Sequence, residues 1–154
     1  EALYQAQTQA PSSEAAIQAF EKVGHDHAGT PAAFEALMAL GEIYGKKPGA
    51  EGQAVDWFKK AESQASTSRE RLFARYSLCF AQEKSGKLAD ALMTLEAARS
   101  LGEPLLKSEI ALTRARLLAR SGKTLEAKQA FEGVIKDFSG TQAAKTAEQW
   151  KAMQ

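Results

Sequence analysis

Three short stretches of the sequence contain residue types that could do chemistry. Residues 25–27 read His-Asp-His and offer imidazole and carboxylate ligands for a divalent metal. Cys79 is the single cysteine and therefore the only thiol that could act as a nucleophile. Residues 49–52 read Gly-Ala-Glu-Gly, a glycine-rich turn of the kind that can surround a phosphate. These stretches raise three hypotheses: a metal site, a covalent catalyst and a phosphate-binding loop.

None of the three hypotheses is supported by the neighbouring sequence. His25 and His27 have no third ligand nearby and fall at the end of an expected helix, where polar residues are common. Cys79 has no histidine near it in sequence to act as a base. Residues 49–52 lack the spacing and the following Lys-Ser/Thr of a phosphate loop. We therefore predict no catalytic residue, no metal site, no cofactor and no enzymatic activity.

Charge and composition restrict the possible partners. The chain has 20 Lys and Arg against 19 Asp and Glu, so no net field attracts nucleic acid or an anionic membrane. One cysteine cannot form an internal disulfide, which leaves the redox compartment open. No apolar run reaches 18 residues, so membrane association would need a segment outside this chain. Because the chain starts at Glu1, we expect it to be a fragment of a longer protein.

An apolar pattern recurs along the chain. An alanine is followed four positions later by a large apolar residue and three positions after that by another apolar residue, which puts all three on one helix face. The leading alanines are 38, 37 and 36 residues apart. The four copies are Ala16/Phe20/Val23, Ala54/Phe58/Ala61, Ala91/Leu95/Ala98 and Ala127/Phe131/Val134. A second marker, residues 29–33, returns at 140–144, so the pattern predicts a repeat protein.

The residues between the copies predict helices in antiparallel pairs. Ala, Glu, Lys, Leu, Gln and Arg dominate and no stretch alternates with period two, which favours an all-α fold. Thr30 before Pro31 predicts a helix start, and Thr67 with Glu70 has the spacing of a capping box. We expect a truncated helix at 1–9 and a complete helix at 14–25. The predicted single domain consists of units at about 1–28, 29–66, 67–102 and 103–139, followed by a cap at 140–154.

The second unit resembles a known repeat family. Leu37-x2-Leu40-Gly41-x2-Tyr44, followed after a turn by Ala54-x3-Phe58, is similar to the tetratricopeptide repeat (TPR). In this pattern Gly41 lets the two helices of a hairpin approach closely. The resemblance implies a right-handed α/α superhelix of about four helical hairpins plus a C-terminal capping helix. It also implies a non-enzymatic scaffold that binds a protein or peptide.

One junction resembles a narrower group within this superfamily. Residues 136–144 read Lys-Asp-Phe-Ser-Gly-Thr-Gln-Ala-Ala, although Ser139 replaces the proline usual there. Similar junctions occur in outer-membrane assembly lipoproteins, the Tol-Pal coordinator and translocon-associated periplasmic proteins of bacteria. The resemblance implies a periplasmic or membrane-anchored protein that assembles or maintains the cell envelope. The alternatives are a cytoplasmic TPR adaptor and a self-associating module that stacks through its terminal helices, and the oligomeric state stays open.

The resemblance also indicates which residues line the inner groove of the superhelix. Phe73, Tyr76 and Phe80 lie three and four positions apart and would form a peptide-binding stripe, with Tyr76 the most accessible. Packing of the same residues against adjacent pairs is the alternative. The other predicted groove residues make one end acidic and the other basic, and they are Glu35, Met38, Glu42, Glu83, Lys84, Leu112, Arg116 and Arg120.

Overall fold

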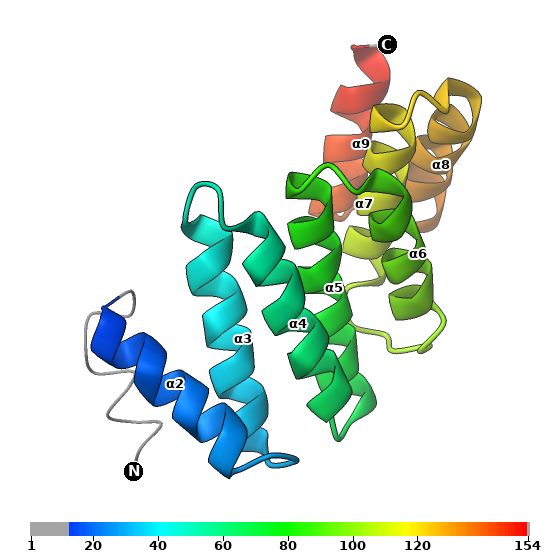
Figure 1. Ribbon diagram of the computed structural model, residues 1–154. Coiled ribbons are helices and arrows are strands. Elements are labelled where there is room, and N and C mark those ends of the chain that lie inside the picture. The colour runs from blue at the N-terminus through cyan, green and yellow to red at the C-terminus, as the bar shows by residue number, and fades with distance from the viewer. Residues whose placement is uncertain (1–12, 154) are drawn as a thin grey trace.

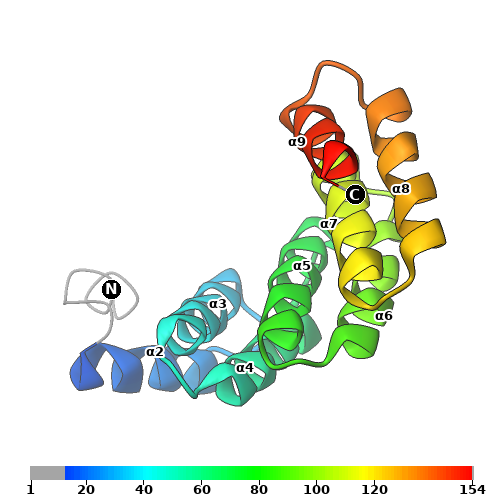
Figure 2. The same cartoon turned by 90° about the horizontal axis from the view of Figure 1, so that it is seen from above.

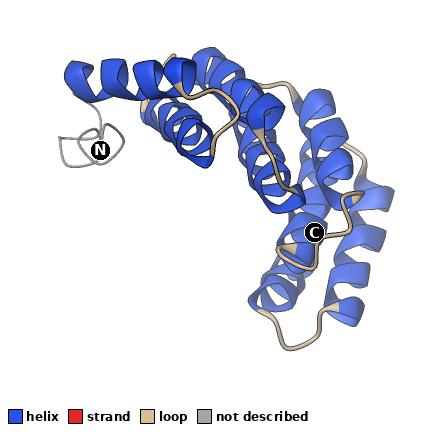
Figure 3. Ribbon diagram, turned by 90° about the horizontal axis from the view of Figure 1, so that it is seen from below, coloured by secondary structure: helices blue, strands red, loops and turns tan. Residues whose placement is uncertain are grey.

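The computed structural model describes residues 13–153, and these residues form eight helices and no strand. The helices are α2 (Glu14–Asp26), α3 (Pro31–Lys46), α4 (Glu51–Gln64), α5 (Ser68–Lys84), α6 (Leu88–Arg99), α7 (Lys107–Arg120), α8 (Thr124–Asp137) and α9 (Gln142–Ala152). The helix predicted at 1–9 lies outside the described residues. Figure 3 shows that short loops join the helices throughout the described part.

The helices form two layers that curve together. In the order of the chain they pack as antiparallel neighbours, and α3/α4, α5/α6 and α7/α8 are the three hairpins of the described part (Figure 1). Helices α3, α5, α7 and α9 make the inner, concave layer, and α2, α4, α6 and α8 make the outer layer (Figure 2). The predicted all-α, right-handed superhelix is confirmed. Its core is a row of apolar clusters between successive helices.

Side-chain caps fix where four of the helices begin. The hydroxyls of Ser13, Thr30 and Thr141 each accept a hydrogen bond of 3.2 Å from the backbone N–H three residues later. Thr67 accepts from the backbone N–H of Glu70 at 3.1 Å, and the Glu70 carboxylate accepts from the backbone N–H of Thr67 at 3.0 Å. The predicted capping box is therefore present, and α5 begins where the sequence indicates.

Gly41 holds the α3/α4 hairpin close together, as its place in the repeat predicts. A Cβ atom added to Gly41 would lie 2.5–2.7 Å from three ring atoms of Phe58. Phe58 itself is buried, together with Val55 of the same helix and Leu78 of α5. The first two hairpins are thus joined through one aromatic side chain that fills the space a larger residue at position 41 would occupy.

The junction between α6 and α7 differs from the other turns. The predicted fourth unit starts at residue 103, but its first helix begins only at Lys107. Pro104 lies in the intervening loop, and Leu106 takes a left-handed backbone conformation with φ 62°, a strained region for a branched residue. Leu106 also provides no side-chain cap to α7. The turns before α4, α6 and α8 each have a glycine at positive φ, whereas this junction has Gly102 at positive φ and Leu106 as well.

Candidate protein-binding groove

All the predicted groove residues lie on α3, α5 and α7, three helices of the concave layer. Glu35, Met38 and Glu42 belong to α3, and Leu112, with the two predicted arginines, belongs to α7. Glu35 and Glu42 are exposed, whereas Met38 and Leu112 are partly buried and pack against the core clusters. Helix α5 contributes the three aromatic residues and lies between α3 and α7.

The aromatic stripe on α5 is partly exposed, but in a different order from the one predicted. Phe73 and Phe80 are 38% and 36% exposed, and Tyr76 is more deeply buried. The Tyr76 hydroxyl lies 3.4 Å from the Thr113 hydroxyl of α7, and burial raises the pKa of Tyr76. The Tyr76 and Phe80 rings meet edge to face at 5.0 Å. The prediction that Tyr76 is the most accessible is therefore wrong, because Tyr76 packs against Phe80 and Thr113 and is less exposed than either phenylalanine.

A buried ion cluster joins α5 to α7 at the predicted basic end. Glu83 is 4% exposed, and its carboxylate accepts two hydrogen bonds from Arg116, at 2.6 and 2.7 Å. Arg120 donates to the same carboxylate. The Arg116 guanidinium also lies 5.6 Å from the centre of the Phe80 ring. Glu83 is thus not an exposed groove residue. Both arginines already pair with its carboxylate before any partner binds.

A pocket opens in the concave layer between α3 and α5. Its volume is about 220 Å³, and Gly41 and Gly45, one helical turn apart on α3, line it. The Lys84 ammonium of α5 donates a hydrogen bond of 2.8 Å to the Gly45 carbonyl. Phe58 and Phe80 contribute apolar surface to the same pocket. Phe80, at one end of the predicted aromatic stripe, therefore borders a pocket that could hold one side chain.

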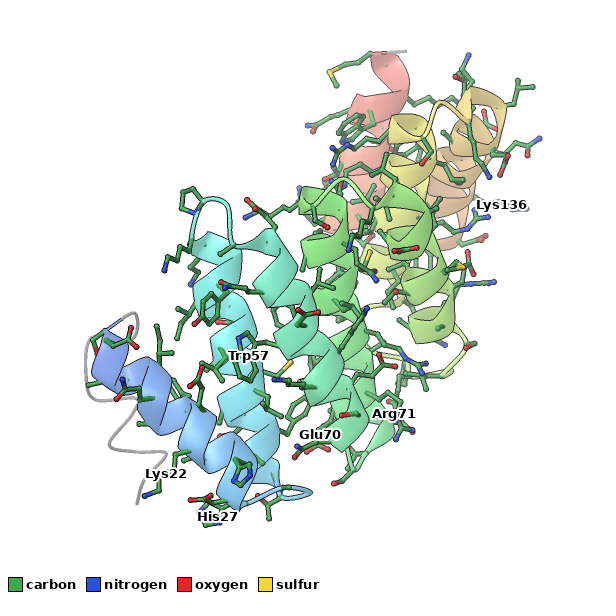
Figure 4. All side chains as sticks on the ribbon, in the orientation of Figure 1. Lys22, His27, Trp57, Glu70, Arg71 and Lys136 are labelled. Atoms are coloured by element: carbon green, nitrogen blue, oxygen red, sulfur yellow. The ribbon has the colours of Figure 1, made fainter. Side chains whose placement is uncertain are left out.

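The residues first considered for catalysis and metal binding lie apart from this pocket. The His25 ring and the Asp26 carboxylate are 2.9 Å apart, and this hydrogen bond lowers the pKa of Asp26. His27 follows the end of α2 at the surface (Figure 4). No group of three or more His, Cys, Asp or Glu side chains that could hold a metal occurs in the described part. Cys79 is fully buried, which raises the pKa of its thiol to about 12 and keeps it protonated at neutral pH.

Membrane insertion has no candidate among the described helices. From residue 13 to residue 153, no helix has both the length and the apolar character needed to cross a bilayer.

Comparison with known proteins shows the fold. No protein-family model matches the chain, and no curated protein matches it. Among solved structures, the TPR-like repeats of a kinesin light chain of Podosopora anserina match with a TM-score of 0.73 and 18% identity, over 98% of this chain and 81% of that one. A crystal structure of MamA matches with a TM-score of 0.68 and 22% identity, over 97% and 79% of the two chains. The chain has a TPR-like fold.

The TPR-like pattern explains why sequence analysis missed the pocket. Gly41 occupies the repeat's small position, and its role in helix packing is expected from the motif. Gly45 and Lys46 fall at the end of α3, where they read as the start of a turn. The available signal was the spacing of the two glycines, since residues four apart share one helix face.

Proposed function

We propose that this TPR-like chain is a non-enzymatic scaffold that binds a segment of another protein along α3, α5 and α7. The observation that carries the proposal is the exposure of two phenylalanines, Phe73 and Phe80, on one face of an inner helix. Phe80 also borders the pocket beside α3 and contacts Arg116 of α7, so this face extends across the concave layer. Exposed apolar side chains grouped on one face are typical of interaction sites.

The contacts that hold Phe80 in place favour a binding role for the aromatic stripe. Phe80 is held by the Tyr76 ring on its own helix and by the Arg116 guanidinium on the next inner helix. Arg116 is itself fixed by two hydrogen bonds to Glu83. A side chain that is already held in place loses little conformational entropy when a partner covers it, so more of the contact energy contributes to affinity.

We further propose a bacterial envelope location, periplasmic or membrane-anchored, with a role in envelope assembly or maintenance. The support is the sequence of the junction at 136–144, which joins α8 to α9 and ends in the Thr141 cap. Fractionation of the source cells tests the location, and recovery of the protein in the cytoplasm would favour the cytoplasmic adaptor instead. Sedimentation equilibrium tests the alternative that copies of the chain associate through their terminal helices. A scaffold that binds other proteins needs no second copy of itself.

The double change Phe73→Ala with Phe80→Ala should remove partner binding. Aromatic anchors at the centre of an interface are often worth about 2 kcal/mol each, which corresponds to roughly a 30-fold loss of affinity per residue. The measurement is a pull-down from source-cell extract, quantified by mass spectrometry for the wild-type and variant proteins. Circular dichroism must first show that the helix content is unchanged.

The matched control changes two exposed apolar residues on the outer layer. Met93 of α6 and Leu125 of α8 are 68% and 78% exposed, and Met93→Ala with Leu125→Ala removes exposed apolar surface there. We expect the control to retain every partner that the wild-type protein recovers. Loss of the same partners in the control, with retention in the Phe73/Phe80 variant, would place binding on the outer layer and contradict the proposal.

A further inference from the structure

The pocket between α3 and α5 has an apolar interior. Gly41 and Gly45 add no side chain to it, while the Phe58 and Phe80 rings and Ala81 give it apolar walls. Phe58 is 5% exposed and fixed against Gly41, so this wall is part of the core and is already in place before any partner binds. A preformed apolar pocket of about 220 Å³ is suited to one aliphatic or aromatic side chain.

Charged groups surround this pocket and favour one kind of partner. Lys46 and Lys84 line it and are exposed, as is the single carboxylate beside them, Glu42. The hydrogen bond from the Lys84 ammonium to the Gly45 carbonyl uses one of its three N–H donors and leaves two for a ligand. Across Phe80, Arg116 and Arg120 share one carboxylate, Glu83. Four cations and two carboxylates give this region a net charge of +2.

We propose that the pocket takes one apolar side chain from an acidic segment of the partner protein. The apolar side chain enters the pocket between α3 and α5, and carboxylates next to it in the segment pair with Lys46 and Lys84. The inference rests on the proposed function, since it concerns the same concave face. Although Glu42 belongs to the end of the groove predicted to be acidic, the partner segment is acidic here because the lysines and arginines around the pocket outnumber the carboxylates.

Selection from a random peptide library displayed on phage, against the wild-type protein, tests this inference. We expect the enriched peptides to share a Leu, Phe, Ile or Met with Asp or Glu beside it. Each enriched sequence is then synthesised with a fluorescent label, and its affinity is measured by anisotropy at low and moderate salt. Because exposed charges contribute to binding, we expect the affinity to fall as salt increases.

The Gly45→Leu variant should weaken binding of the selected peptides by at least about tenfold, because Gly45 lines the pocket and leucine adds a bulky side chain at this wall. A Cβ atom at position 45 would lie 3.8 Å from the Cβ of Ala54, an ordinary contact, so the variant is expected to fold. Gly133→Leu is the matched control, since a Cβ atom there meets nothing within 4 Å and α8 belongs to the outer layer. Lys46→Glu with Lys84→Glu should weaken binding comparably, because two positive charges beside the pocket become negative charges that repel an acidic segment.

Three outcomes would overturn the inference. Enrichment of basic peptides would show that the charges around the pocket select a different partner. Peptides that lose affinity with Phe73→Ala, but bind Gly45→Leu and the double lysine variant as tightly as wild type, would overturn the pocket and leave the proposed function standing. If no peptide were enriched, the result would contradict both the inference and the proposed function, because both require binding of a linear segment.

Discussion

Replacing Phe58 by alanine is expected to lower the free energy of unfolding by about 3–5 kcal/mol. Phe58 is 5% exposed and belongs to the apolar cluster that joins α3, α4 and α5, where Val55 and Leu78 are also buried. Its ring fills the space opposite Gly41, so truncation leaves a cavity between two hairpins. Urea denaturation followed by circular dichroism gives the free energy of unfolding for both proteins.

Lys59→Ala is the matched control on the same helix. Lys59 is exposed, and its replacement should change the free energy of unfolding by less than about 0.5 kcal/mol. Lys60 serves less well, because its ammonium lies 4.0 Å from the centre of the Trp57 ring. If Phe58→Ala and Lys59→Ala had equally small effects, the hairpins would not be joined through Phe58.

The double change Arg116→Ala with Arg120→Ala is expected to destabilise the fold by about 3–5 kcal/mol. Both arginines donate to Glu83, whose side chain is only 5% exposed, so their loss leaves a buried carboxylate without a compensating charge. The same urea measurement applies. Adding Glu83→Gln to the double variant should restore most of the lost stability, because a neutral amide of similar size replaces the uncompensated carboxylate.

The Glu83→Gln rescue separates charge from packing. A triple variant as unstable as the double variant would mean that the arginines stabilise the fold through packing of their side chains and not through Glu83. Reversing the charges at Arg116 and Arg120 would therefore not be a clean test of whether these arginines attract a partner. It would place two more carboxylates beside a buried one, and loss of binding would then follow from unfolding.

Features that depend on short stretches of sequence could be predicted. The helix starts at Thr30 and Thr67 depend on residues at most three positions away, and the structure has both caps. Ala54, Phe58 and Ala61 share a helix face because of their spacing, and all three are buried. The TPR-like fold follows from such local patterns repeated at an almost constant period.

Features that depend on how neighbouring hairpins meet could not be predicted. Glu83 reads as a groove residue in sequence, but its partners lie 33 and 37 residues away on the next inner helix. The ranking of Phe73 above Tyr76 in exposure likewise depends on the position of α7, whose Thr113 approaches the tyrosine hydroxyl. The late start of α7 depends on a left-handed Leu106, a conformation that no turn motif in the sequence indicates.

Photo-crosslinking in the source cells tests the central claim most directly, namely that a partner protein lies along the concave layer. A benzophenone amino acid replaces the exposed Phe73 of α5 in one variant and the exposed Leu125 of α8 in a second variant. We predict that the probe at position 73 captures a partner protein and that Gly45→Leu in the same chain reduces this product. A partner captured only from position 125, with none from position 73, would contradict the claim and place the interaction on the outer layer.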